Sequence, residues 1–176
     1  MGLAPLPADE WDDDVRKALM GMLPRDRQNP EGAGIALATL VRHPDLTRAF
    51  LGFSVHLLFR STLSDRLREL VILRVAHRQD CAYESAHHTD LARMAGLTDA
   101  EIEAARLGKS DVAFEQVVLG AVDELFDNSR LSDRTWAALG EHLDEKQLMD
   151  FVFTAGCYSM MALAFNSFGI EPEHER

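Results

Sequence analysis

Side chains that cap the N-termini of helices recur along this chain, each directly before an apolar run with helical spacing. Thr98 and Asp144 are also followed three positions later by Glu101 and Gln147, which is the capping-box pattern. Alternating apolar runs, which would indicate strands, are few. The sequence therefore predicts an all-α fold, a compact multi-helix bundle. The remaining capping signals are Ser64, Asp80 and Ser132.

The apolar spacing between these signals sets the expected helix bounds. Residues 29–34 are rich in Gly, Pro and Asn and predict a loop, and residues 171–176 predict a frayed tail. The expected helices cover residues 11–20, 35–41, 45–59, 65–78, 81–95, 98–108, 110–128, 132–140 and 144–168.

Composition narrows the class of protein. A chain of 176 residues fits one domain, and no linker divides it. The net charge of −11 opposes binding to nucleic acid. The first residues lack the basic and apolar regions of a signal peptide, so we expect a cytoplasmic protein. Residues 151–170 carry no charge, but polar side chains interrupt them, so we expect a core or interface helix and no membrane partner.

Five chemically active side chains gather in the middle of the sequence. Cys81, Glu84, His87 and His88 share one stripe of a predicted helix, because residues three, four and seven apart lie on one face. A two-residue break after position 78 would fold the preceding helix back and bring Glu69 against that stripe. Coupled acid, thiol and imidazole groups of this kind can hold one group as an acid and another as a base.

The same stretch resembles a known family. The run Arg-Glu-Leu-Val-Ile-Leu at 68–73, a Cys twelve positions after its Glu and a His seven after that Cys are similar to the carboxymuconolactone decarboxylase-like and alkylhydroperoxidase D-like superfamily. Residues 96–102 and 166–172 resemble later elements of that family. The resemblance covers about 45–172, leaves 1–44 as a helical extension of a single domain 1–176, and implies homo-oligomers, usually trimers or hexamers.

One position departs from the peroxidase branch of that superfamily. That branch carries a Glu, a Cys-x-x-Cys motif and a His, and Glu69, Cys81 and His88 match three of these positions. The second Cys is replaced by Glu84, so Cys81 cannot close an internal disulfide with that position. Cys157 lies in the apolar last helix and is interpreted as a buried, inert thiol. The pattern is more similar to the non-redox branch.

The resemblance and the departure together predict an acid–base enzyme, a lyase or related activity, on a small carbonyl or lactone acid. Decarboxylation, isomerisation and hydrolysis all stay open. In this hypothesis Glu84 and His88 exchange the proton, Glu69 orients His88 and Cys81 completes the catalytic group. Substrate contacts are expected from Arg74, whose guanidinium would attract a carboxylate, and from Tyr83 and His87.

No cofactor and no metal are expected. Glu84-x-x-His87 resembles half of a carboxylate-bridged two-metal site, but the other Glu-x-x-His, at 171–174, contains a proline and lies in the tail. Arg66 and Arg68 are also candidates for holding an anionic substrate, and a solvated helix face is the simpler interpretation of both.

Two other functions remain open. Cys81 alone could act as a thiol peroxidase, with a second protein or a small thiol completing the cycle. Alternatively, the chain is a non-catalytic oligomeric binding protein. The simplest interpretations of the single residues are a surface pair of Glu84 with His88 and a buried, apolar role for Cys81.

Overall fold

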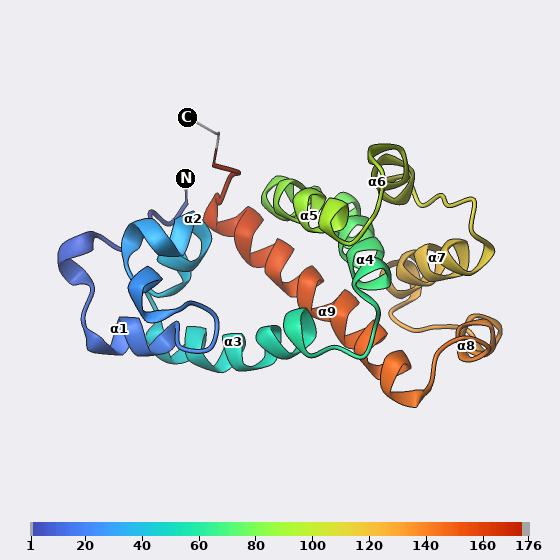
Figure 1. The fold of residues 1–176 in the computed structure, drawn as a ribbon, viewed down its shortest axis with the longest axis horizontal. Helices are drawn as coiled ribbons and strands as arrows, with labels where there is room; N and C mark the ends of the chain where they lie inside the picture. The colour runs from blue at the N-terminus through green and yellow to red at the C-terminus, as the bar shows by residue number, and fades with distance from the viewer. Residues whose placement is uncertain (1, 174–176) are drawn as a thin grey trace. The chain divides into compact units, whose positions relative to one another are not determined.

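The computed structural model describes residues 2–173 and contains only helices in that range, which confirms the all-α prediction (Figure 1). Nine α-helices and two short 3₁₀ helices follow one another without a strand among the described residues. The 3₁₀ helices are η1 (Ala8–Glu10) and η2 (Arg25–Arg27). The α-helices are α1 (Asp13–Ala18), α2 (Pro30–Leu40), α3 (Pro44–Phe59), α4 (Asp65–Arg78), α5 (Ala82–Met94), α6 (Asp99–Arg106), α7 (Ala113–Asn128), α8 (Asp133–Gly140) and α9 (Glu145–Phe168).

Most of the predicted capping side chains start helices as expected. The Ser64 hydroxyl accepts a hydrogen bond from the Leu67 amide, and α4 then runs over the predicted residues. Thr98 and Glu101 cap each other's backbone at the start of α6, which confirms that capping box. Each such cap satisfies amides that a helix start leaves without partners.

Helix α2 begins inside the predicted loop. The side-chain oxygen of Asn29 accepts a hydrogen bond from the Gly32 amide. Pro30 occupies the first helical position, where its missing N–H removes no hydrogen bond of the helix. Gly34, at φ 67°, interrupts the helix in the left-handed region. The Gly and Pro residues that predicted a loop therefore serve as a helix start and a kink.

Asp80 does not cap α5. Its φ of +50° makes it the turning residue of the link between α4 and α5, and Cys81 occupies the capping position. Helix α7 likewise starts three residues later than predicted, because the Ser110 hydroxyl donates to Glu115 and does not cap the helix.

The chain divides into two compact units. The first unit runs to Arg60 and includes the segment from Phe165 onward. Its helices α1 and α3 pack together. Within its small apolar core, Trp11 donates its indole N–H to the Leu6 carbonyl. Glu173 accepts the Ile35 amide at 2.8 Å, so the predicted frayed tail is wrong up to that residue. Residues 174–176 lie outside the described part. A single domain over 1–176 stays a prediction.

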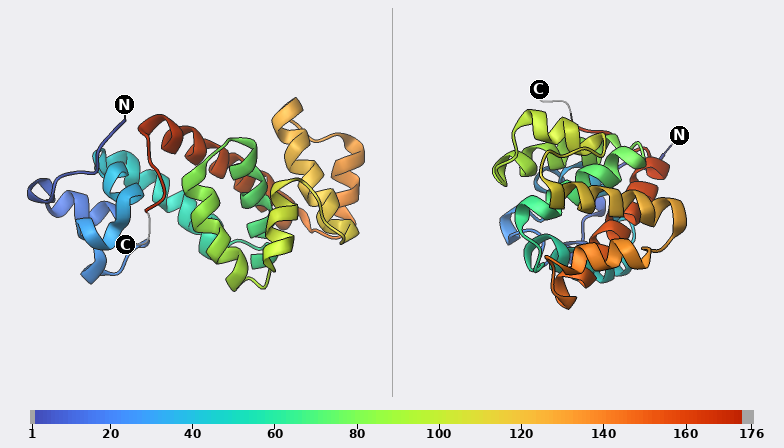
Figure 2. Two further views of the ribbon diagram at one scale, coloured as in Figure 1. Left: turned by 90° about the horizontal axis from the view of Figure 1, so that it is seen from above. Right: turned by 90° about the vertical axis from the view of Figure 1, so that its right-hand side faces the viewer.

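The second unit, Ser61–Ala164, is built around α4. Figures 1 and 2 show α5 beside α4, and α6 and α7 also pack against it. Every residue from Glu69 to Ala76 is buried, so α4 is covered on all sides, as a central helix must be. Glu69 and Arg74 are therefore buried charges, and each requires a partner.

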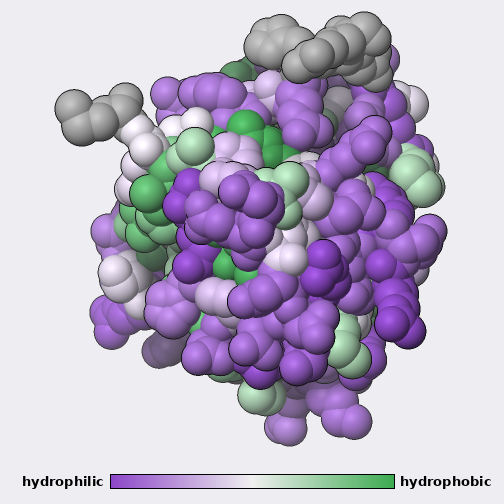
Figure 3. Space-filling model, turned by 90° about the vertical axis from the view of Figure 1, so that its left-hand side faces the viewer, coloured by the Kyte–Doolittle hydropathy of each residue, from purple (hydrophilic) through white to green (hydrophobic). Residues whose placement is uncertain are grey.

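Helix α9 is the one helix within residues 2–173 whose length and hydropathy would allow it to cross a membrane. Half of its apolar window is buried inside the protein. The molecular face in Figure 3 is mainly hydrophilic. The fold is compatible with a soluble protein, as the interrupted apolar run predicted.

Candidate functional site

The link between α4 and α5 positions the predicted site. Only Gln79, Asp80 and Cys81 separate the two helices, and the Cys81 amide donates to the Ala76 carbonyl at 2.9 Å. This tight turn folds α5 against α4, as the predicted break after position 78 required.

Glu69 and His88 meet across this hairpin. His88 Nδ1 lies 2.7 Å from Glu69 Oε2, and the two residues are 4% and 0% exposed. Arg68 donates its Nε–H to the other carboxylate oxygen at 3.1 Å. Because a carboxylate can only accept, the hydrogen of this bond lies on His88 Nδ1, which leaves Nε2 as the ring nitrogen that Glu69 does not engage. The spatial relation predicted from the sequence is therefore present.

Glu84 lies on the same face of α5, one turn before His88, but it is not paired with it. The residue is 1% exposed, and neither carboxyl oxygen has a hydrogen-bond partner among the described residues. Burial raises the pKa of Glu84 to about 8, because desolvation disfavours the charged form. The carboxyl is thus mainly protonated at neutral pH. A surface ion pair with His88, one of the simpler interpretations, is wrong.

Helix α9 forms the other side of this group. The ring of Tyr158 stands edge-on to the His88 ring, with centroids 4.9 Å apart. Burial, followed by the charge of Glu84, raises the pKa of the Cys157 thiol to about 12 and that of the Tyr158 hydroxyl well above its usual value. Glu84 therefore lies close enough to Cys157 and Tyr158 to act on both.

Cys81 is buried at the capping position of α5. In the described part of the chain neither it nor Cys157 forms a disulfide. Cys157 is buried and its raised pKa keeps it a thiol, which agrees with the predicted inert role.

The structure separates His87 from the buried group. Its ring is exposed, stacks on Tyr83 with centroids 6.2 Å apart, and meets the edge of His88 at 5.5 Å. Partial desolvation between these rings, with the neighbouring imidazole of His88, lowers the pKa of His87. Tyr83 and His87 thus form a surface pair directly outside His88.

Arg74 is engaged elsewhere. Its guanidinium binds Asp123 at 2.6 and 2.7 Å and donates to the Arg106 carbonyl. These bonds tie α4 to α7 and to the end of α6, so the charge expected to attract substrate already has protein partners.

Three residues of the buried group were given no catalytic role in the sequence analysis. A solvated position was the simpler interpretation of Arg68, yet it bridges Glu69 and Asp65. Tyr158 and Thr154 are among the polar side chains that interrupt the apolar run 151–170, and the sequence analysis gave neither a role. Polar residues at i and i+4 within a helix that is otherwise apolar were the available signal, because a buried polar side chain requires a polar neighbour.

No group of three or more His, Cys, Asp or Glu side chains is arranged to hold a metal ion within residues 2–173. The absence of a metal and a cofactor stays a prediction.

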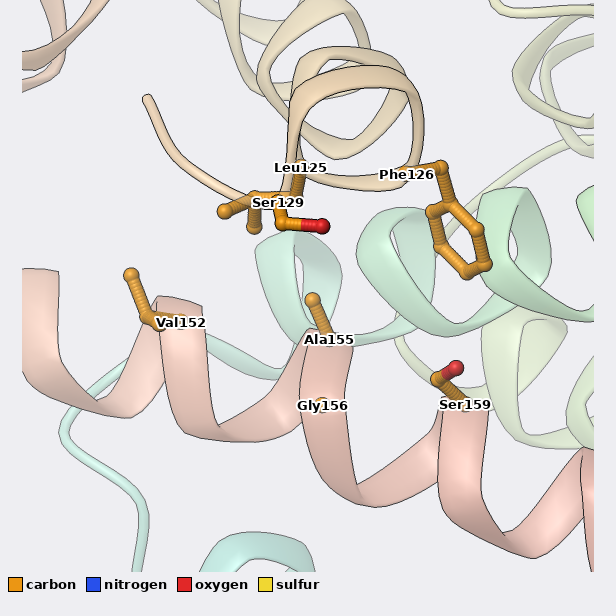
Figure 4. A pocket seen from close by; sticks show the side chains of 7 residues that line it. All are labelled: Leu125, Phe126, Ser129, Val152, Ala155, Gly156 and Ser159. Atoms are coloured by element: carbon orange, nitrogen blue, oxygen red, sulfur yellow. The ribbon is translucent and has the colours of Figure 1, made fainter. Parts of the chain in front are cut away.

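An open pocket of about 280 Å³ lies between α7 and α9 (Figure 4). Figure 4 shows Phe126 of α7 on one side and Ser159 of α9 on the other. Ser159 accepts from the side chain of Gln79, at the end of α4. The pocket is lined by Leu125, Phe126, Ser129, Val152, Ala155, Gly156 and Ser159, so none of the predicted site residues contributes to it.

Solved structures share this fold. An uncharacterized peroxidase-related protein from Ralstonia eutropha JMP134, described as an alkylhydroperoxidase AhpD core, superposes with a TM-score of 0.79 at 17% identity over 98% of this chain and 94% of that chain. A peroxidase-related protein from Silicibacter sp. TM1040 gives 0.73 at 19% identity, over 98% and 92%.

A putative antioxidant defence protein AhpD from Agrobacterium tumefaciens matches 76% of this chain and 94% of its own, with a TM-score of 0.69 and 19% identity. No curated protein sequence matches this chain. Separately, residues 44–125 match the model of the carboxymuconolactone decarboxylase family.

These likenesses define an all-helical protein with the alkylhydroperoxidase D-like fold. The family match over 44–125 and the shared fold support the resemblance to the carboxymuconolactone decarboxylase / alkylhydroperoxidase D-like superfamily that the sequence predicted.

Proposed function

We propose that this chain is a non-redox acid–base enzyme that acts on a small carbonyl or lactone acid by decarboxylation, isomerisation or hydrolysis. The observation that carries this proposal is a buried carboxyl with a raised pKa on the same face of α5 as an imidazole that Glu69 orients. Glu84 is buried with a pKa raised to about 8, and His88 is held through Nδ1 by Glu69. Such a pair holds an acid and a base ready at the same pH.

The roles follow from the bonding. Nε2 of His88 accepts a proton from the substrate, and the Glu69 carboxylate stabilises the imidazolium that forms, as a buried acceptor on Nδ1–H does. Glu84, still protonated, returns a proton to the developing oxyanion or carbanion. Arg68 balances the charge of Glu69. Arg74 is given a structural role here, because Asp123 already neutralises it.

The test is turnover of a panel of β-keto acids and unsaturated lactone acids. We expect Glu84→Gln and His88→Gln each to lower kcat/KM about 100-fold or more, and the wild-type rate to fall above pH 8 as Glu84 ionises. Glu141→Gln, at an exposed position, is the matched control. Normal turnover by Glu84→Gln would remove this assignment.

A second candidate is a thiol peroxidase that uses Cys81, supported by its position at the N-terminus of α5, where the helix dipole favours a thiolate. The thiolate would take the terminal oxygen of a hydroperoxide and release the alcohol. An external thiol would then displace water from the sulfenic acid to form a mixed disulfide, and a second external thiol would regenerate Cys81. Alkylation of Cys81 no faster than that of free cysteine at pH 7 would contradict it.

A third candidate, a non-catalytic binding protein, is supported by the burial of Glu69, Glu84 and His88, which leaves little surface for substrate. It predicts that no compound in the panel is turned over and that Glu84→Gln changes stability alone.

We also propose that the chain forms a homo-oligomer through α9. Its exposed residues follow one another at spacings of four and three, which is the pattern of a helix that packs against another helix. They are Met149, Phe153, Gly156, Met160 and Leu163. A trimer or hexamer is expected from the family resemblance. A cytoplasmic location is proposed as well, supported by two cysteines that form no disulfide with each other.

A further inference from the structure

The carboxylate of an acid substrate requires a cation near His88, and α4 carries four arginines. Three of them already bind carboxylates of α6 and α7; these are Arg66, Arg74 and Arg78. Arg66 shows how complete this pairing is, because Glu101 and Glu115 each lie 2.6 Å from its guanidinium. An incoming carboxylate at these positions would meet the negative charge that is already there.

The fourth arginine, Arg68, spans the boundary between the buried site and the surface. On its inner side, Nε and Nη2 both lie 3.1 Å from Oε1 of Glu69, which is completely buried. On its outer side, Nη1 donates to a carboxylate oxygen of Asp65 at 2.7 Å. The Asp65 side chain is 75% exposed, whereas that of Arg68 is 12% exposed. The guanidinium therefore has one edge in the site and another edge towards solvent.

The two partners of Arg68 differ in how easily a ligand can replace them. Its pair with Glu69 is buried, and breaking it would leave an uncompensated charge inside the protein. Its pair with Asp65 lies at the surface, where such pairs contribute little to stability. Nη1 and Nη2 each carry two N–H donors, and each is engaged by one described carboxylate. A second carboxylate can therefore bind the outer edge by displacing Asp65 alone.

Glu69 places Arg68 next to the imidazole. One oxygen of this carboxylate contacts the guanidinium, and the other lies 2.7 Å from Nδ1 of His88. The guanidinium and the ring are thus separated by a single carboxyl group, so one small molecule can reach both. The net charge of −11 repels anions in general, which makes a local cation of this kind more important for the binding of an acid.

We propose that Arg68 binds the carboxylate of a small keto acid or lactone acid, and that Asp65 occupies this position on the guanidinium until the acid displaces it. Arg68 is then a specificity-determining residue that selects acids over neutral carbonyl compounds. The inference deepens the proposed function, and its catalytic meaning rests on that function, whereas the binding of an acid does not.

Two probes that differ only in the charged group test this site without an assay of activity. Levulinate is a keto acid, and 2-pentanone has the same carbonyl chain with a methyl group in place of the carboxylate. The binding of each probe is followed through the ¹⁵N resonances of the His88 ring, which report on the site itself. We expect the wild-type protein to bind levulinate at least about 10-fold more tightly than 2-pentanone.

Asp65→Asn gives the sharpest prediction, because it should improve binding. A neutral asparagine competes less for the guanidinium, so we expect the Kd of levulinate to fall about three-fold or more and that of 2-pentanone to stay unchanged. Asp45→Asn is the matched control, because Asp45 is likewise exposed, lies in the first turn of α3 and pairs with Arg48 three residues later. It changes the net charge equally without removing a partner of Arg68, and its Kd for levulinate should stay within about two-fold of the wild type.

Arg68→Gln should abolish the preference for levulinate over 2-pentanone. Arg68→Lys should keep part of it, because lysine retains the charge but not the planar fork. Since both variants also alter the partner of Glu69, the comparison of Asp65→Asn with Asp45→Asn is decisive. Equal Kd values for levulinate in Asp65→Asn and the wild type, equal gains in both aspartate variants, or no binding at all would overturn the proposal.

The outcomes for this site and for the proposed enzyme are separable. Tighter binding of levulinate to Asp65→Asn, with normal turnover by Glu84→Gln, would remove the enzyme proposal alone. Turnover that depends on Glu84 and His88, with levulinate binding unchanged in Asp65→Asn, would remove the role of Arg68 alone.

Discussion

At the scale of single residues, Glu84 is the side chain of the site whose burial in the ionised form most lowers the stability of the folded protein. Its ordinary pKa of 4.5 rises to about 8 in the folded protein. Below pH 4.5 both folded and unfolded chains hold the proton. Between 4.5 and about 8 only the unfolded chain releases it, so the folded protein loses stability as pH rises, and the loss is complete above 8.

Glu84→Gln should therefore flatten this pH dependence. The wild type is expected to lose on the order of 5 kcal/mol of unfolding free energy between pH 4.5 and 8, and the neutral glutamine should lose little. Urea denaturation at a series of pH values measures the difference. The exposed Glu141→Gln should follow the wild type, and parallel curves for wild type and Glu84→Gln would refute the buried-acid description.

Glu69 fixes the tautomer of His88, and this can be tested separately. Glu69→Gln replaces the carboxylate by an amide that can either accept from Nδ1–H or donate to Nδ1. We expect a mixture of tautomers in ¹⁵N spectra of the ring, in place of the single Nδ1–H form, and a loss of about 2–4 kcal/mol because Arg68 is left without its buried partner.

Asp65→Asn is the comparison for that variant, because it removes only the exposed partner of Arg68. It should cost less than about 1 kcal/mol and leave the His88 spectrum as it is. A single Nδ1–H tautomer retained in Glu69→Gln would show that another group orients the ring.

At the scale of helices, the Arg74–Asp123 pair joins α4 to α7. Asp123→Asn keeps the shape and removes the charge, so we expect a loss of about 1–3 kcal/mol in unfolding free energy. Asp127→Asn, at the more exposed partner of Arg78, should cost less than about 1 kcal/mol. Unchanged stability in Asp123→Asn would restore Arg74 as a candidate for substrate binding.

The helices themselves were largely predictable, and particular residues show why. Ser64, Thr98 and Ser132 cap through contacts within four residues, which the sequence displays directly. Residues 29–34 were wrongly predicted as a loop, because Pro and Gly, here Pro30 and Gly34, occur in loops, helix starts and kinks alike.

The site was predictable along α4 and α5 and not across to α9. Glu69, Glu84 and His88 share a local hairpin, so helical spacing was enough to bring them together. Which face of α9 meets them depends on packing between segments about 70 residues apart, and for this reason Thr154 and Tyr158 were missed. The partner of Arg74 was missed for the same reason.

At the scale of the whole molecule, the exposed apolar face of α9 leads to a prediction about the oligomeric state. Met149 and Met160 lie exposed on it, and Met94 is exposed on α5. We expect the wild type to sediment as an oligomer, the double variant Met149→Glu/Met160→Glu as a single chain, and Met94→Glu as the wild type, because charges are costly in a packed apolar interface. A wild type that stays a single chain at high concentration would disprove assembly through α9.

The short turn at Asp80 also bears on how the protein acquires its site. Glu69 and His88 are only 19 positions apart, and closing so small a loop costs little chain entropy. Contacts of low sequence separation form early in folding. We therefore expect the hairpin to place Glu69 against His88 early in folding, and we expect insertions in distant loops to leave that alignment unchanged.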